Sequence, residues 1–169
     1  PHPPRAGIRT TTALGRFRRL DGGDDSGGVD NAVLTFVAER GRAGLPASAL
    51  LSRAGLSLPA ADTTIQRLER HRLVVRVADL LVAPPVLQEL CDEVLAALKA
   101  HHTSQPLSEG LPREEARERI FGRTSPHIFE HVLSTLADDG KIVARDRLAL
   151  AGHQVSLSPE ESQARDAIE

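Results

Sequence analysis

Apolar side chains recur every three or four positions from about residue 30 onward, a spacing typical of amphipathic helices. Residues 1–29, by contrast, contain PHPP and DGGDDSGG, which predicts a linker that could carry a short docking segment. We expect Asp30 or Asn31 to cap a first helix that ends at Gly41. Its expected buried side chains are Val33, Leu34, Phe36 and Val37.

Two more helices and a β-hairpin are predicted after this first helix. The tripeptide GLP at residues 44–46 is expected to begin a second helix, with Pro46 at its first position and Gly55 as its stop. A third helix is predicted from about Pro59 to His71. The segment LVVRVADLLVAP has two short β-branched runs around AD, which indicates a hairpin. This order is the winged-helix plan, a helix-turn-helix followed by a β wing.

The second half of the chain repeats the same order. A long helix is predicted from about Val86 to His101, GLPREEARERIF predicts the second helix, SPHIFEHVLSTLADDG the third, and KIVARDRLAL a hairpin with RD at its tip. The two GLP tripeptides begin at residues 44 and 110, and Leu68 and Leu136 hold matching places in the third helices. A nearly constant offset indicates duplicated modules.

The predicted fold is therefore mainly α with small β-hairpins, arranged as tandem winged-helix modules. Residues 1–29 are assigned to a linker from a preceding domain and residues 30–84 to the first module. Residues 85–153 form the second module, and residues 154–169 are expected to start a further one.

Composition favours a globular protein of the cytoplasm. Hydrophobic residues make up 40% and charged residues 26%, the balance of a soluble domain. No run approaches the roughly 18 apolar residues that a membrane-spanning helix needs, and the N-terminus lacks a signal-peptide layout. The lone Cys91 can form no internal disulfide and no multi-cysteine zinc site, and it is expected to be a small buried side chain.

Adjacent carboxylates at Glu114 and Glu115 could suggest acid–base chemistry. They follow Pro112 in the first turn of a predicted helix, where negative charge complements the helix N-terminus. Neighbouring helix positions point about 100° apart, so the two side chains do not converge as a catalytic dyad would. We interpret them as a helix start.

The segment HIFEH matches the H-x-x-E-H pattern of one class of zinc peptidase. His127 and His131 share a helix face, but a catalytic zinc site needs a third protein ligand, and both histidines are expected on the solvated face. His101 and His102 are interpreted as a surface pair near a helix end. The chain also has no G-x-x-x-x-G-K-[ST] phosphate loop, so we predict no enzyme activity, no metal and no cofactor in it.

Nucleic-acid contact is the remaining functional hypothesis. Residues 1–84 carry 12 Lys and Arg against 8 Asp and Glu, whereas residues 85–169 carry 9 against 15. The third helix of a helix-turn-helix often enters a groove, and in the first module Arg67, Arg70 and Arg72 are predicted on its outward side. The second module offers acidic groups there, which oppose phosphate. A purely structural array joining other domains is the competing interpretation.

Several motifs of the second module carry a family resemblance. A long helix is followed by PLSEGLPREEAR, then by a hairpin that ends LALAGH and a serine-rich continuation. This block, residues 85–162, resembles the C-terminal winged-helix region of the bacterial selenocysteine-specific elongation factor, SelB. The first module is similar only in plan and position, and PHPPR resembles the family's passage out of its last elongation-factor β-barrel.

The resemblance implies a translation factor that delivers selenocysteinyl-tRNA to the ribosome at a recoded UGA, guided by an mRNA hairpin. The family's GTPase lies in N-terminal domains absent from this chain, and its hairpin is bound chiefly by the last modules of a four-module array. No GTP-binding or hairpin-reading residue is therefore carried over. The two modules would be a spacer within a monomeric, cytoplasmic factor, linking the tRNA-binding body to the hairpin-binding tip.

Two other functions stay open from the sequence. The first is a tandem winged-helix DNA-binding transcriptional regulator, which would use the same helix-turn-helix elements on duplex DNA. The second, more remote, is an enzyme built around HIFEH.

Overall fold

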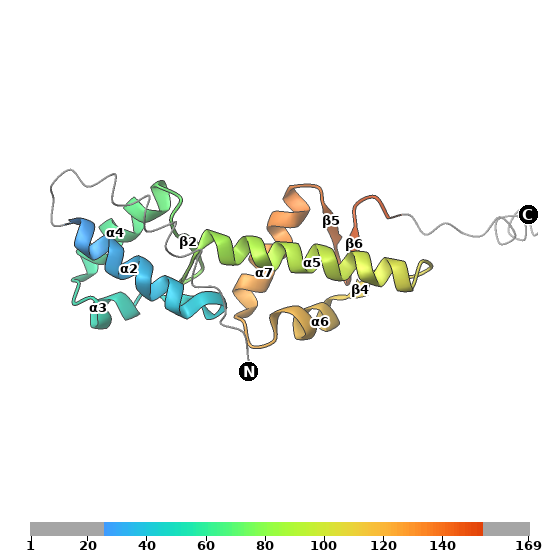
Figure 1. Cartoon of the computed structure of the whole chain (residues 1–169), viewed down its shortest axis with the longest axis horizontal. Helices are drawn as coiled ribbons and strands as arrows, with labels where there is room; N and C mark the ends of the chain where they lie inside the picture. Colours follow the sequence, from blue (N-terminus) through green and yellow to red (C-terminus); the bar gives the residue numbers. More distant parts are fainter. Residues whose placement is uncertain (1–25, 154–169) are drawn as a thin grey trace, which may run out of the picture. The chain divides into compact units, whose positions relative to one another are not determined.

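The structure is a computed structural model that describes residues 26–153, and the chain divides into two compact units between Val86 and Leu87. Figure 1 traces the two units along the chain. Most of the predicted linker, and the predicted start of a further module over residues 154–169, lie outside the described residues. None of the helices between residues 26 and 153 is long and apolar enough to cross a membrane.

From residue 26 onward, the first unit contains three helices, a short 3₁₀ turn and a three-stranded antiparallel sheet. In chain order they are α2 (Ser26–Arg40), the 3₁₀ turn Gly41–Ala43, β1 (Leu45–Pro46), α3 (Ala49–Arg53), α4 (Leu58–Arg70), β2 (Val75–Val77) and β3 (Leu80–Val82). The sheet order is β1-β3-β2. The predicted winged-helix plan is confirmed.

The start of the first helix was predicted wrongly. Because α2 begins at Ser26, the last residues of the predicted linker are helical and Asp30 lies inside the helix instead of capping it. Asp30 is buried, and its carboxylate accepts hydrogen bonds from the Arg67 guanidinium of α4. The Asp30 carboxylate, which was expected to accept hydrogen bonds from the first turn of its own helix, thus binds a side chain of another helix.

The GLP tripeptide is a strand, not the beginning of a helix. Leu45 pairs with Leu81 across the sheet, and the N–H of Ala47 donates to the carbonyl of Asp79 at the hairpin tip, 2.8 Å away. The second helix begins only at Ala49, so the placement of Pro46 at its first position was wrong. Proline is tolerated because β1 is an edge strand.

The second unit repeats this arrangement. It contains α5 (Pro84–Ser104), β4 (Leu111–Pro112), α6 (Arg113–Ala116), a π-helical turn over Arg117–Phe121, α7 (Pro126–Asp138), β5 (Ile142–Ala144) and β6 (Arg147–Leu150). Its sheet order is β4-β6-β5. Leu111 pairs with Leu148, and the N–H of Arg113 donates to the carbonyl of Asp146 at the hairpin tip, 3.2 Å away.

Gly110 shows why this strand must follow a glycine. Its φ is +146°, and a Cβ built on it would lie 2.5 Å from the carbonyl oxygen of Leu148. The backbones of β4 and β6 could not approach so closely with any side chain at this position. The glycine of the second GLP is therefore required by the sheet that holds the wing against the helices.

Each unit has its own apolar core. The first is built from aliphatic side chains: Val33, Val37, Leu45, Leu50, Ala61, Ile65, Leu68, Val74 and Leu81. In the second, Phe121 and Phe129 meet edge to face with ring centroids 4.9 Å apart, among buried leucines, isoleucines and valines. Cys91 is buried, as predicted, and burial raises the pKa of its thiol.

Candidate nucleic-acid interface

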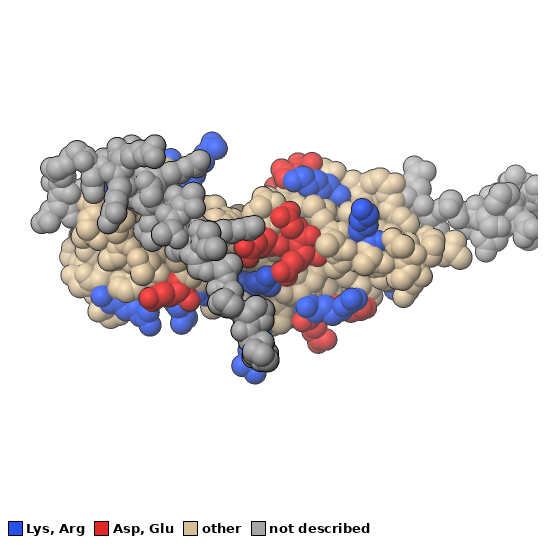
Figure 2. All heavy atoms as spheres, in the orientation of Figure 1, with Lys and Arg blue, Asp and Glu red and all other residues tan. Residues whose placement is uncertain are grey.

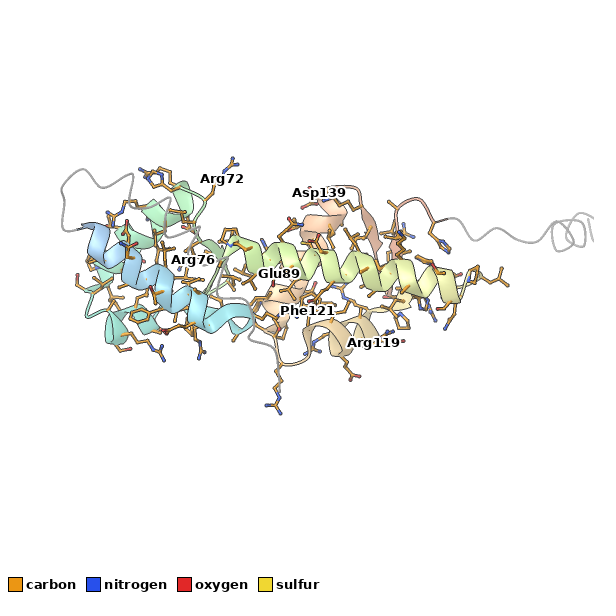
Figure 3. The ribbon with its side chains drawn as sticks, in the orientation of Figure 1. Arg72, Arg76, Glu89, Arg119, Phe121 and Asp139 are labelled. Carbon is orange, nitrogen blue, oxygen red and sulfur yellow. The ribbon has the colours of Figure 1, made fainter. Side chains whose placement is uncertain are left out.

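The first unit presents exposed cations where α4 ends. Arg70, His71 and Arg72, here called the α4 corner, are all exposed. The helix closes with the N–H of Arg72 donating to the carbonyl of Glu69 and that of Leu73 donating to Leu68, both at 2.9 Å. This pair of bonds is a Schellman closure, which requires a left-handed residue. Arg72 supplies it with a φ of +56°, and Figure 3 shows its side chain pointing away from the ribbon.

Arg67 is not presented outward as predicted. Its Nε donates to Oδ2 of Asp30 at 3.0 Å, and a second guanidinium nitrogen donates to the other carboxylate oxygen, so the pair is bidentate. The Asp30 side chain is only 11% exposed, so the arginine compensates a nearly buried charge. Arg67 thus ties α4 to α2, and of the three arginines predicted to contact nucleic acid Arg70 and Arg72 are exposed whereas Arg67 is half-buried.

Arg76 on β2 is a further exposed cation that the sequence analysis did not single out. It stands between Val75, which is half-buried, and Val77, which is buried. Its Nε donates weakly to the carbonyl of Ala78, 3.4 Å away. The alternation of VRV was the available signal, because successive strand residues face opposite sides. The segment from Arg70 to Val77 contains four potential cations and no carboxylate.

The second unit carries acidic groups at the same places. Asp138, Asp139 and Gly140 stand at the end of α7, where the first unit has its corner, and Lys141 pairs with Asp139 at 3.0 Å. Acidic side chains also gather over α5 on the face drawn in Figure 2, where Figure 3 labels Glu89. A phosphate backbone would be repelled from this part of the unit.

The HIFEH segment lies on α7 as an ordinary amphipathic helix. Ile128, Phe129, Val132, Leu133 and Leu136 are buried as predicted, whereas His127 is exposed and His131 half-buried. Glu130 forms an ion pair with Arg113 of α6. Over residues 26–153, no cluster of three histidine, cysteine or acidic side chains could hold a metal ion.

Glu114 and Glu115 lie in the first turn of α6, as predicted. Glu114 pairs with Arg117 at 3.4 Å and Glu115 with Arg119 at 3.0 Å, one helical turn along. Both pairs are exposed to solvent, where such contacts add little stability. Neither carboxylate approaches the other's partner, which fits a helix start and not a catalytic dyad.

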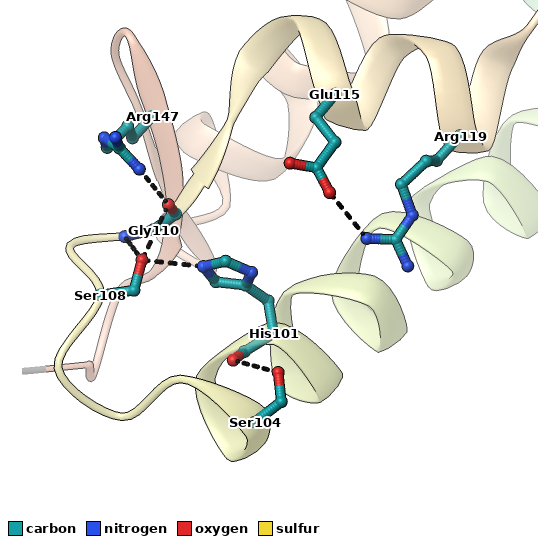
Figure 4. Close-up of polar contacts among 7 residues, drawn as sticks. All are labelled: His101, Ser104, Ser108, Gly110, Glu115, Arg119 and Arg147. Carbon is teal, nitrogen blue, oxygen red and sulfur yellow. Dashed lines mark hydrogen bonds and ion pairs between the residues drawn. The ribbon is translucent and has the colours of Figure 1, made fainter.

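A polar cavity of about 390 Å³ lies beside Glu115 in the second unit, between the end of α5, α6 and β6. Figure 4 shows its main groups. Across the cavity from the Glu115–Arg119 pair, Arg147 donates to the carbonyl of Gly110 at 3.0 Å, and His101 Nε2 lies 2.8 Å from the Ser108 hydroxyl. Both arginines already donate to acceptors of this chain, so these contacts support the loop before β4.

His102 was predicted at the surface with His101, and this is wrong. His102 is buried, and its ring stacks on His153 with centroids 3.5 Å apart. Its Nε2 accepts from the N–H of Leu150 at 3.3 Å, which fixes the neutral form of the ring. Burial lowers the pKa of His102, and the neighbouring His153 and His101 lower it further. The side chain pins the wing strand β6 to α5.

Comparison with known protein families gives a match in the second unit. Residues 95–149 match the family described as elongation factor SelB, winged helix, in its second-module form. The match runs from the middle of α5 nearly to the end of β6. A search of curated proteins found no match to the chain.

Proposed function

Since residues 95–149 match the winged-helix family of elongation factor SelB, we propose that this chain works as part of a selenocysteine-specific translation elongation factor. In this role the two units link the body that binds GTP and selenocysteinyl-tRNA to the tip that binds the mRNA hairpin. The match over residues 95–149 is the observation that carries the proposal.

The repetition of the winged helix supports a linking role. Both units hold the wing in the same way. Each GLP tripeptide supplies an edge strand, and the N–H of the residue after the tripeptide donates to a carbonyl at the hairpin tip. Two modules with separate cores extend a chain without adding a reaction centre. The proposal accordingly places GTP binding and hydrolysis elsewhere in the factor and assigns this chain no catalytic step and no cofactor.

The first test is the gene that encodes the chain. The proposal requires that the same open reading frame encode a GTPase body with a G-x-x-x-x-G-K-[ST] phosphate loop. A reading frame that encodes no such body would refute it.

The second test measures recoding in the complete factor. A reporter with an in-frame UGA followed by the mRNA hairpin should lose selenocysteine insertion when either unit is deleted. Point changes on the exposed surface of α7, such as His127→Ala, should leave insertion unchanged and serve as controls. Full insertion after deletion of a unit would contradict the linking role.

Binding assays separate this proposal from a DNA-binding regulator. The chain should show no sequence-specific preference for duplex DNA in a gel-shift series that includes the mRNA hairpin, tRNA and random DNA duplexes. Tight, sequence-specific binding to one DNA duplex would favour the regulator.

A further inference from the structure

The two units close their third helix in the same way but with different residues. In the first, Leu73 N–H donates to Leu68 and Arg72 closes the helix at a φ of +56°. In the second, Lys141 N–H donates to Leu136 at 2.9 Å and Gly140 closes the helix at a φ of +68°. Arg72 and Gly140 therefore occupy one position in a shared hydrogen-bond frame.

Glycine is the residue that this frame favours. A left-handed φ brings Cβ against the carbonyl group in every L-residue except glycine, and arginine has no short polar side chain to compensate locally. Open space surrounds Gly140, so the position tolerates a side chain sterically and the cost lies in the backbone conformation. Arg72 thus lowers the stability of the first unit relative to glycine.

Four positions at and near this one carry potential cations in the first unit and none in the second, whereas Lys141 and Arg145 of the second unit stand where the first has Leu73 and Val77. The two helix ends align Arg72 with Gly140. By the same offset, the second unit has Asp138, Asp139 and Ala144 at the places of Arg70, His71 and Arg76. The first unit therefore has cations where the second has two carboxylates and two small residues. Favourable interaction with the α4 helix dipole would explain a cation near this end, but not a cation at the left-handed position that closes the helix.

From these observations we propose that the α4 corner, with Arg72 at its centre, contacts phosphate groups of an RNA backbone. The choice of RNA rests on the proposed function, and the corner itself rests on exposure, charge and the unfavourable backbone position. Strained residues persist where the strain serves a function, and a guanidinium projected from a helix end can donate two hydrogen bonds to one phosphate.

The decisive variant is Arg72→Gly, because it should stabilise the fold and at the same time weaken RNA binding. The substitution removes the left-handed cost and should raise the melting temperature of the first unit by about 2–6 °C. It should also weaken binding of a fluorescein-labelled, fully paired RNA hairpin by about threefold to tenfold at low salt. The slope of log affinity against log salt concentration should become shallower by about one, the value for one phosphate contact.

Two controls use the same chain. Arg53→Gln removes one exposed cation from the end of α3 and should leave affinity within about twofold when the variants are also compared at about 0.15 M salt, where charges more than about 8 Å apart are largely screened. Gly140→Arg places arginine in the matching frame of the second unit, beside Asp138 and Asp139. It should lower the melting temperature and leave RNA affinity unchanged.

The outcomes separate this inference from the proposed function. Equal affinity of Arg72→Gly and the unchanged chain would overturn the RNA contact, as would the absence of any RNA binding at low salt. Neither result affects the linking role, which the deletion of whole units in the recoding assay tests. A higher affinity for duplex DNA than for the hairpin, lost in Arg72→Gly, would overturn RNA as the partner and also contradict the proposed function.

Discussion

The close approach of β4 to β6 predicts a large loss of stability for Gly110→Ala. The added Cβ would lie 2.5 Å from the carbonyl oxygen of Leu148, where an ordinary carbon–oxygen contact is about 3.3 Å or longer. Both atoms belong to backbone, so no side chain can rotate to relieve the contact. One strand must move by nearly an ångström, and this disturbs the pairing of Leu111 with Leu148.

The magnitude follows from two separate costs. A residue other than glycine at a φ of +146° occupies a sparsely populated backbone region, at about 1–3 kcal/mol. Forcing an extra methyl group into a closely packed position costs a further 1–3 kcal/mol, roughly. The expected loss is therefore about 2–6 kcal/mol, a large part of the roughly 5–15 kcal/mol that stabilises a small domain.

Gly140→Ala is the matched control, because it also introduces a side chain at a left-handed φ but meets nothing within 4 Å. It should cost about 1 kcal/mol. Unfolding in urea is best followed by circular dichroism, since the chain has no Trp or Tyr, and amide exchange at Leu111 and Leu148 would localise the change. Equal losses in the two variants, or a loss below about 1 kcal/mol for Gly110→Ala, would refute the close-approach argument.

Three further predictions concern stability. Arg67→Ala leaves the buried Asp30 carboxylate without its bidentate partner and should destabilise the first unit by about 1–3 kcal/mol in urea unfolding; an unchanged midpoint would contradict the structural role of the pair. Ala78→Gly relieves a φ of +56° at the hairpin tip and should stabilise that unit by about 0.5–1 kcal/mol, whereas a loss would show that the turn tolerates alanine. The lowered pKa of His102 means that the folded state binds fewer protons than the unfolded state. Stability of the second unit should therefore be complete above about pH 6.5 and fall below it, as the His102 ring, which faces His101 and His153, takes up a proton on unfolding. His102→Gln should flatten this slope in pH-dependent unfolding, and an unaltered slope would assign the effect to other groups.

The helix and hairpin order could be predicted because periodicity reports burial directly. Leu68 and Leu136 recur at helical spacing on faces that are buried, and the AD and RD tips interrupt β-branched runs. The GLP strands could not be predicted, because a pair of residues has no period. Pro112 also favours the start of a helix as much as an edge strand. Only the partner strand, 36 or 37 residues later, decides between them.

Side-chain partners were the other part that the sequence could not supply. Helical spacing placed Arg67 outward, but the partner that draws it inward, Asp30, lies on a different helix 37 residues away. His102 was misjudged for the same reason, since its neighbours Leu150 and His153 come from the far end of the unit. Contacts over such separations leave no local pattern.

The duplication allows the two units to be compared without any relative of the chain. The same residue types recur at positions that the shared backbone hydrogen bonds define, such as Leu68 and Leu136 or the two GLP strands. The ion pairs that fix the third helix differ, however: Arg67 joins α4 to α2 in the first unit, whereas Glu130 joins α7 to α6 in the second. Folding therefore accepts more than one solution for charged contacts, and a charge difference alone is weak evidence of function. Arg72 is different because the alternative in the sister unit, glycine, is the better residue for folding, so stability does not explain why arginine stands there.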